Sequence, residues 1–175
     1  MENSTTIALD TTIRFERINA MLTGQGEMAL AGNVAIQSLH LRGDIEWLYA
    51  VADVKGLYNG KIIVQFKVQY DNDHRKFTVH NLNIELADDS MFAKMAGKFV
   101  NSMFADKLDS KLEEVVNAKF TLMLNDILEQ VKNLPLPKGG SLGFDAQSFK
   151  LYHLRTDGLG LHFIAALTGR AVLEY

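Results

Sequence analysis

A long helix is the strongest pattern in this chain. Residues 90–134 contain no proline and one glycine, and their apolar side chains recur at every third or fourth position. That spacing returns the same face of an α-helix to a core. The sequence on both sides alternates instead with the two-residue period of β-strands. The pattern predicts an α+β fold in which a strongly curved antiparallel sheet wraps around a long, kinked helix, with a short N-terminal helix.

The kink is predicted near Ala105. At about 100° of rotation per residue, the apolar residues before Ala105 share one face of the helix and those after it share the opposite face. One straight helix on one surface cannot bury both. Asp106 is a suitable N-cap for a second segment over about residues 107–133. The two sets are Phe92, Met95, Ala96, Phe99, Val100 and Met103, and then Leu108, Leu112, Val115 and Val116.

Signals for termini place the other helix and the following linker. Asp10, Thr11 and Thr12 precede apolar residues at helical spacing, and Gly24 follows them, which predicts a short helix over about residues 12–23. Leu134-Pro135-Leu136-Pro137 is predicted to end the long helix and begin a linker, because proline disfavours helical geometry in the residue before it.

Three strands are predicted between the helices. In residues 45–54 both alternating faces are apolar, so this strand is expected to be covered on both sides. Residues 61–70 alternate between apolar and polar side chains, and a polar turn at residues 71–74 leads into a strand over residues 76–86. Its apolar phase switches near His80 and Asn81, which predicts a bulge or sharp bend.

The C-terminal part of the chain is predicted to form a long β-hairpin. Residues 144–154 and 159–175 are its strands, and Asp157-Gly158 between them is a strong turn signal. Alternate residues from Leu159 to Tyr175 are apolar or glycine, and Gly169 is expected to mark a kink in this strand.

Composition narrows the class of protein. The 175 residues match one domain. A net charge of −3 argues against nucleic acid as a partner, since phosphate binding needs a concentrated basic surface. There is no cysteine, so disulfides and thiol catalysis are excluded. No apolar window approaches the ~18 residues of a membrane-spanning helix, and the first residues lack the basic and apolar regions of a secretory signal.

No catalytic, metal or cofactor site is predicted, so the chain is not expected to be an enzyme. None of the five histidines has a metal-ligating partner at helical spacing. Neighbouring carboxylates point apart on strands or face solvent on helices, whereas general acid–base catalysis needs them in a cleft. The glycine turn at residues 24–26 lacks the third glycine and the strand-to-helix context of a dinucleotide site.

The large number of aromatic and methionine side chains is the feature that points to a ligand. Ordinary core packing explains each residue alone, but methionine and phenylalanine together line adaptable cavities well. We therefore expect a hydrophobic ligand between the helices and the concave sheet. The predicted ligand-binding residues are Trp47, Tyr49, Phe66, Phe92, Met95, Phe99, Met103, Phe120, Met123, Leu124 and Phe163.

The order of these elements resembles the tubular lipid-binding (TULIP) superfamily, in which a curved antiparallel sheet cradles a long helix and acyl chains lie in the seam. With Leu134-Pro135-Leu136-Pro137-Lys138-Gly139 and the final ribbon, most of the chain resembles one module of an uncharacterised bacterial family related to that superfamily. The resemblance implies a lipid or another apolar small molecule as partner, and a periplasmic or envelope-associated location. Because members of that family are generally larger, with two such modules and an export signal, this chain is expected to be a single module without its leader, with a second module or a second copy of the chain as a further partner.

Two alternatives remain open. The first is a structural or protein-interaction module with a packed core, no ligand and an exposed sheet edge that docks a partner strand; an enzyme ranks after it. Lysines recur at four-residue steps on the predicted helices. They predict either a solvated helix face or a peripheral contact with anionic membranes. These lysines are Lys94, Lys98, Lys107 and Lys111.

Overall fold

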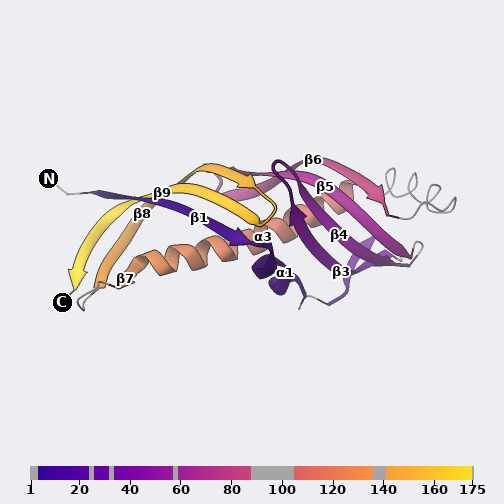
Figure 1. Cartoon of the computed structure of the whole chain (residues 1–175), viewed down its shortest axis with the longest axis horizontal. Helices are drawn as coiled ribbons and strands as arrows, with labels where there is room; N and C mark the ends of the chain where they lie inside the picture. The colour runs from indigo at the N-terminus through magenta and orange to yellow at the C-terminus, as the bar shows by residue number, and fades with distance from the viewer. Residues whose placement is uncertain are drawn as a thin grey trace.

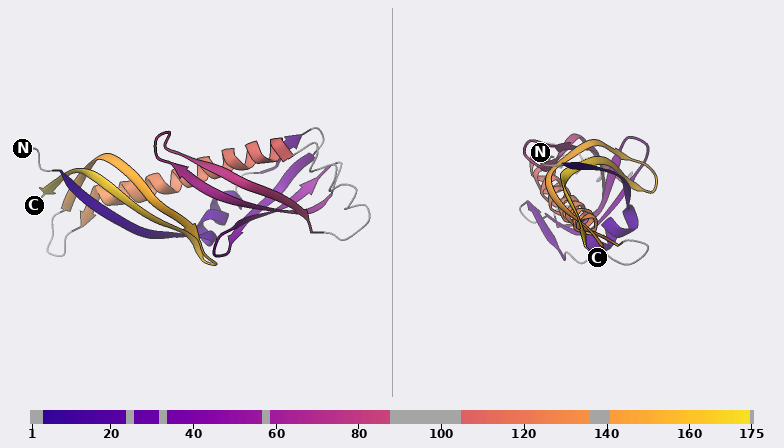
Figure 2. Two further views of the ribbon diagram at one scale, coloured as in Figure 1. Left: turned by 90° about the horizontal axis from the view of Figure 1, so that it is seen from above. Right: turned by 90° about the vertical axis from the view of Figure 1, so that its left-hand side faces the viewer.

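The fold is α+β and is built along one long helix, α3 (Ala105–Lys132). The computed structural model describes residues 4–23, 26–31, 34–56, 59–87, 105–135 and 141–174. Two antiparallel sheets follow each other along α3, one with strand order β1-β9-β8-β7 and the other with order β2-β3-β4-β5-β6 (Figure 1). Seen end-on, the strands curl around the helix (Figure 2). The predicted fold class is confirmed, and the structure divides the predicted sheet into two.

The elements on either side of α3 have these bounds. Before it lie β1 (Thr5–Arg14), α1 (Phe15–Thr23), β2 (Met28–Ala31), β3 (Val34–Gly43), β4 (Leu48–Lys55), β5 (Gly60–Asp71) and β6 (Lys76–Leu86). After it lie β7 (Asn133–Pro135), β8 (Ser141–Thr156) and β9 (Gly160–Glu174).

The N-terminal helix is shorter than predicted. It begins at Phe15 rather than near residue 12, because the preceding ten residues pair with β9 as strand β1. Ile13 is buried in the core, while Ile7 and Leu9 are half-buried on the same face. The apolar residues of α1 follow directly on this strand, so the local pattern does not mark where strand ends and helix begins. The prediction of a helix start at Asp10-Thr11-Thr12 was wrong.

Helix α3 matches the predicted second segment to within two residues at each end. Its predicted inward face is confirmed, since Leu108, Leu112, Val115 and Val116 are all buried. The apolar face predicted before Ala105, and with it the kink, lies outside the described residues. The segment after α3 is not wholly a linker: Asn133, Leu134 and Pro135 pair with β8 as β7. A proline is tolerated there because β7 is an edge strand.

Strand β4 is covered on one side, which corrects the prediction of two covered faces. Leu48, Ala50, Ala52 and Val54 are buried on the concave side of the sheet. The opposite face is only partly covered, and Ile45, just before the strand, is 84% exposed. The helices lie on the concave side, so the convex side of β4 remains at the surface (Figure 2).

The predicted hairpin of β5 and β6 is confirmed, including its bulge. Pairing shifts register where Asn81 and Leu82 stand opposite Phe66 alone. Asn81 has a φ of 55°, a left-handed conformation that asparagine tolerates better than most residues. The bulge lets Phe77 and Val79 before it, and Ile84 after it, all be buried although their phase switches.

The predicted C-terminal hairpin is confirmed, and it has a local distortion at Gly169. Gly169 pairs with Ala146, and the register shifts between Ala146 and Ser148 so that Gln147 is an extra residue. A Cβ atom at Gly169 would lie 2.0 Å from the carbonyl oxygen of Asp145. Only glycine allows this close approach of the two strands.

A side chain in the turn between β5 and β6 forms hydrogen bonds from the larger sheet to the smaller one. The Asn72 Nδ2 atom donates to the Leu151 carbonyl oxygen at 2.9 Å, and the Leu151 backbone nitrogen donates to Asn72 Oδ1 at 2.8 Å. The amide therefore pairs with β8 as a neighbouring strand would. It does so beside a second register shift of β8, between Leu151 and His153. This contact fixes the turn of the larger sheet against the smaller one.

Replacing Asn72 with alanine is expected to lower the free energy of unfolding by about 1–3 kcal/mol, because it leaves two backbone groups of the buried Leu151 without partners. Urea denaturation would measure the loss. Asp73→Ala is a matched control, since Asp73 is exposed in the same turn. Equal stability of the two variants would contradict the role of Asn72.

Replacing Gly169 with alanine is expected to destabilise the domain by about 1–3 kcal/mol, because the new methyl group would overlap the backbone of Asp145. Thermal denaturation followed by circular dichroism would check this. Gly158→Ala serves as the control, since a Cβ atom at Gly158 would meet nothing within 4 Å. A Gly169→Ala protein as stable as the Gly158→Ala protein would refute the argument.

Candidate ligand groove

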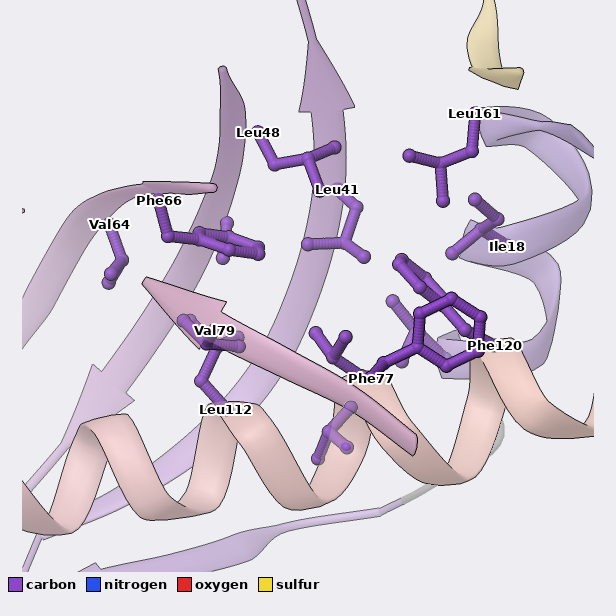
Figure 3. Packing of buried hydrophobic residues seen from close by; sticks show 14 of the residues in the cluster. Ile18, Leu41, Leu48, Val64, Phe66, Phe77, Val79, Leu112, Phe120 and Leu161 are labelled. Carbon is purple, nitrogen blue, oxygen red and sulfur yellow. The ribbon is translucent and has the colours of Figure 1, made fainter. Parts of the chain in front are cut away.

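The middle of the seam between α3 and the sheets is filled by aromatic side chains. The Phe77 ring meets the Phe120 ring edge-on at a centroid distance of 5.4 Å and the Phe163 ring at 6.5 Å. Figure 3 shows Phe77 of β6 beside Phe120 of α3. Five of the predicted ligand-binding residues belong to this one buried cluster: Phe66, Phe120, Met123, Leu124 and Phe163. All five are 6% exposed or less, so they pack against one another.

The other predicted ligand-binding residues are not in this cluster. Trp47 and Tyr49 lie on the convex side of the larger sheet, opposite in phase to the buried Leu48 and Ala50. There the Lys67 ammonium lies 4.4 Å from the Trp47 ring centroid, and the Tyr49 hydroxyl donates to Asp44 Oδ2 at 2.8 Å. Four more predicted residues, Phe92, Met95, Phe99 and Met103, lie outside the described residues.

A small apolar crevice remains between the N-terminal half of α3 and the larger sheet. Its volume is about 10 Å³, which is roughly the space of one water molecule. Between the residues that line it, this crevice is too small for a ligand. The crevice is lined by Met28, Ile36, Leu39, Ala50, Ala52, Val64, Leu108, Lys111, Leu112 and Val115.

A much larger groove opens between the C-terminal half of α3 and β8, with a volume of about 440 Å³. We call it the α3–β8 groove. It combines an apolar part with a polar and charged rim, and it falls within the size range of small-molecule sites. It is lined by Arg75, Asn125, Leu128, Glu129, Lys132, Ala146, Gln147, Ser148, Phe149 and Leu167.

The groove exists because strand β7 is short. β7 pairs with Ser141, Leu142 and Gly143 of β8, and from Phe144 onward no strand in the described part of the chain neighbours β8 on that side. Residues 146–149 of β8 line the groove instead. The missing strand leaves a gap between β8 and α3.

The apolar part of the groove is built by side chains that continue the core outward. Leu167 on β9 is buried, and Phe149 on the neighbouring strand β8 lies directly opposite it in the strand pairing. The Phe149 ring meets the Tyr70 ring edge-on at 5.9 Å, which fixes its orientation. Phe149 and Leu128 of α3 are half-buried, so apolar surface remains available to a ligand.

The rim of the groove carries charge of both signs. Arg75 reaches it from the turn that Asn72 anchors to β8, and its φ of 53° places it in the left-handed region. Lys132 and Glu129 form an ion pair on the last turns of α3. These groups could orient the polar end of a ligand whose apolar part lies on Leu128 and Phe149.

A third groove, of about 290 Å³, lies where the tips of the two sheets meet, and its lining includes Glu46, Lys67, Gln69 and Arg155. The Lys67 and Glu46 charges pair at 3.4 Å. Most of its polar lining carries charge, and the groove lies away from the seam between α3 and β8. It is smaller than the α3–β8 groove and has no lining residue from the long helix, although three charged side chains line each of the two grooves.

The arrangement nearest to catalytic chemistry lies on the outer face of the smaller sheet. The Arg155 Nε atom donates to His162 Nδ1 at 2.9 Å, and His162 Nε2 bonds Asp10 Oδ1. Because Nδ1 accepts from Arg155, the ring proton is on Nε2. Both ring nitrogens are therefore engaged, and neither is available to activate a nucleophile.

The described ranges contain neither a cluster of metal-ligating side chains nor a membrane-spanning helix. In those ranges no three His, Asp or Glu side chains come together as metal ligands would. Neither described helix has the length and hydrophobicity needed to cross a bilayer.

The residues of the α3–β8 groove were missed at the sequence level. Leu167 follows the alternation of the last strand, and Leu128 continues the inward face of α3 by one four-residue step from Leu124. Those signals identify core residues. These residues line a groove because β7 ends early. The pairing of β7 with β8 was not indicated by the pattern around Leu134 and Pro135.

One oxygen of the half-buried carboxylate of Asp109 lacks a hydrogen-bond partner among the described residues. Asp109 Oδ1 on α3 is inaccessible to solvent and accepts no hydrogen bond within the described structure. Burial raises the pKa of this carboxyl above its ordinary value of 3.8, and the negative charges of Glu113 and Asp106 raise it further. At neutral pH the charge of Asp109 therefore opposes folding.

The chain belongs to the DUF4403 family: the model of this family, described as a domain of unknown function, matches residues 1–174. No curated protein and no solved structure matches the chain.

Replacing Asp109 with asparagine is expected to raise the stability of the domain at pH 7. A raised folded pKa means that the protonated form is favoured by folding, so this contribution is complete below pH 3.8 and is lost as the pH rises through the folded pKa. The gain should therefore shrink on acidification towards pH 3.8. Denaturation midpoints measured across this pH range would show it.

Asp106→Asn is the control, because Asp106 lies in the first turn of α3, where a negative charge is favourable. It is expected to give no gain at pH 7. A gain for Asp106→Asn equal to that for Asp109→Asn, or a gain for Asp109→Asn that does not depend on pH, would contradict the assignment.

Proposed function

We propose that this domain is a non-enzymatic module that binds an elongated apolar molecule, such as the acyl chain of a lipid, in the α3–β8 groove. The observation that carries the proposal is the groove itself: about 440 Å³ of space in the seam between the long helix and a curved sheet, with half-buried Leu128 and Phe149 on its apolar side. Each methylene group that leaves water on such a surface contributes about 0.8 kcal/mol. A long chain would gain several such contributions.

The architecture supports the same proposal. Curved antiparallel sheets around one long helix resemble the TULIP superfamily, where acyl chains lie in the seam. We propose that this member of the DUF4403 family is related to those proteins. The relationship would agree with a periplasmic or envelope-associated location, and exposed lysines such as Lys107 would agree with peripheral contact to anionic lipids.

The first test is to look for a ligand that co-purifies. Native mass spectrometry of freshly purified protein is expected to show an extra mass, and chloroform extraction should release it. An environment-sensitive fluorescent fatty acid should gain intensity with the delipidated protein. No extractable lipid together with no fluorescence gain would refute the proposed function.

The second test blocks the groove. Asn125 is an exposed residue of α3 that lines it, so Asn125→Trp would place an indole in the space of the ligand. Displacing two methylene groups of an acyl chain removes about 1.6 kcal/mol, which would raise the Kd for the fluorescent fatty acid about tenfold or more. Gln130→Trp is the matched control, because Gln130 is exposed on the same helix and does not line the groove. Equal affinity of both variants would exclude this groove as the site.

A second candidate function is a packed module that binds another protein. The observation that favours it is the closed part of the seam, where Phe66, Phe77 and Phe120 are fully buried and the remaining crevice holds only about 10 Å³. A protein without lipid or probe response, but with a mass in solution above that of one chain, would support this candidate against the first.

A further inference from the structure

Of the four sheet edges formed by the described strands, three are protected against pairing with another strand. β7 is three residues long and ends in Pro135. β2 is four residues long, with an irregular pairing between Ala29 and Ala31. β6 carries the bulge at Asn81, and its Phe77 backbone nitrogen donates to Asn117 Oδ1 of α3 at 3.1 Å. Short length, proline, bulges and cover by a helix are the usual means of blocking an edge.

The edge of β1 has none of these protections. It is ten residues long and pairs with β9 at ten consecutive positions with no register shift. It contains no proline or lysine, and in the described part of the chain no strand pairs with its other side. Such a regular edge presents unpaired backbone groups as a template for a further strand.

The sequence of β1 complements itself in an antiparallel pair. Thr5-Thr6-Ile7 and Thr11-Thr12-Ile13 flank Leu9 symmetrically. If two copies pair about Leu9, each Ile7 lies opposite Thr11, each Thr6 opposite Thr12, and Leu9 opposite itself. These β-branched and threonine pairs are favourable across strands.

This register also keeps both faces of the sheet consistent. Ile7, Leu9, Thr11 and Ile13 are half-buried or buried on one face, and the residues between them are exposed on the other. Pairing about Leu9 places inward residues opposite inward residues, whereas a shift of one residue would not. Pairing about Asp10 would set two carboxylates directly opposite each other, which is unfavourable.

We propose that β1 pairs antiparallel with β1 of a second copy of this chain, so that two four-stranded sheets join into one around a twofold axis at Leu9. The interface is isologous, as in most homodimers. It leaves the α3–β8 groove free, because that groove lies at the other side of the sheet, beyond β8. The proposal does not depend on lipid binding.

Charge substitutions at Ala8 test the register. Ala8 is exposed and would lie opposite Asp10 of the second copy, twice in each dimer. Ala8→Lys is expected to lower the dimer Kd and Ala8→Asp to raise it, each by about fivefold, if each of the two charge pairs contributes about 0.5 kcal/mol. Sedimentation velocity over a concentration series would measure the three constants. Ala29→Asp is the matched control on the exposed edge β2 and should leave Kd unchanged.

A cysteine at the twofold axis gives an independent test. The chain has no cysteine, so Leu9→Cys would introduce one thiol per copy. Directly opposite residues have Cα atoms about 4.5–5.5 Å apart, which suits a disulfide. Mild oxidation is expected to crosslink Leu9→Cys into dimers and to leave Ala29→Cys monomeric.

A wild-type protein that is monomeric at every concentration would overturn the proposed pairing of β1 with β1 of a second copy. So would shifts of Kd in the same direction for Ala8→Lys and Ala8→Asp, or crosslinking of Ala29→Cys as efficient as that of Leu9→Cys. Opposite shifts at Ala8 with selective crosslinking at residue 9 would establish it.

Discussion

The burial of one face of α3 against the concave sides of two sheets is the interaction on which the rest of the structure depends. Leu112, Val116, Phe120 and Met123 of the helix are almost inaccessible to solvent. Burying each such side chain contributes about 1.5–3 kcal/mol, and no other described element contacts both sheets along their length. The helix therefore acts as the common core of two sheets that are not paired with each other as strands.

The contact between the sheets determines where the domain is open. Asn72 reaches from the larger sheet to Leu151 and so holds the middle of β8 close to the core. At its other end, β8 is held by the three residues of β7. Between these two attachments no described strand pairs with β8 on the side that faces α3. The α3–β8 groove lies there. The groove is open because β8 lacks a described strand partner there. The seam around Phe77 is closed because its aromatic side chains pack against one another.

In the described part of the chain, the grooves of several hundred Å³ lie at the margins of this core. Most of the described aromatic and methionine side chains that suggested a cavity are buried in the packed core. The crevice between α3 and the larger sheet has a volume of only about 10 Å³. Two larger openings formed by described residues are at the edge of β8 and at the tips of the sheets, and the described strand with an unprotected edge is β1.

The sequence by itself determined the elements whose signals are local. The turn at Asp71, the bulge at Asn81, the hairpin at Asp157 and the inward face of α3 from Leu108 each follow from neighbouring residues, and each is present. Only the tertiary structure decided whether residues 5–14 are strand or helix, because β1 pairs with β9, whose residues lie 146 to 164 positions further along the chain. The same holds for β7, for the uncovered face of β4 and for the groove at Phe149. These depend on which distant strand is present or missing beside each residue, and alternation along the chain does not carry that information.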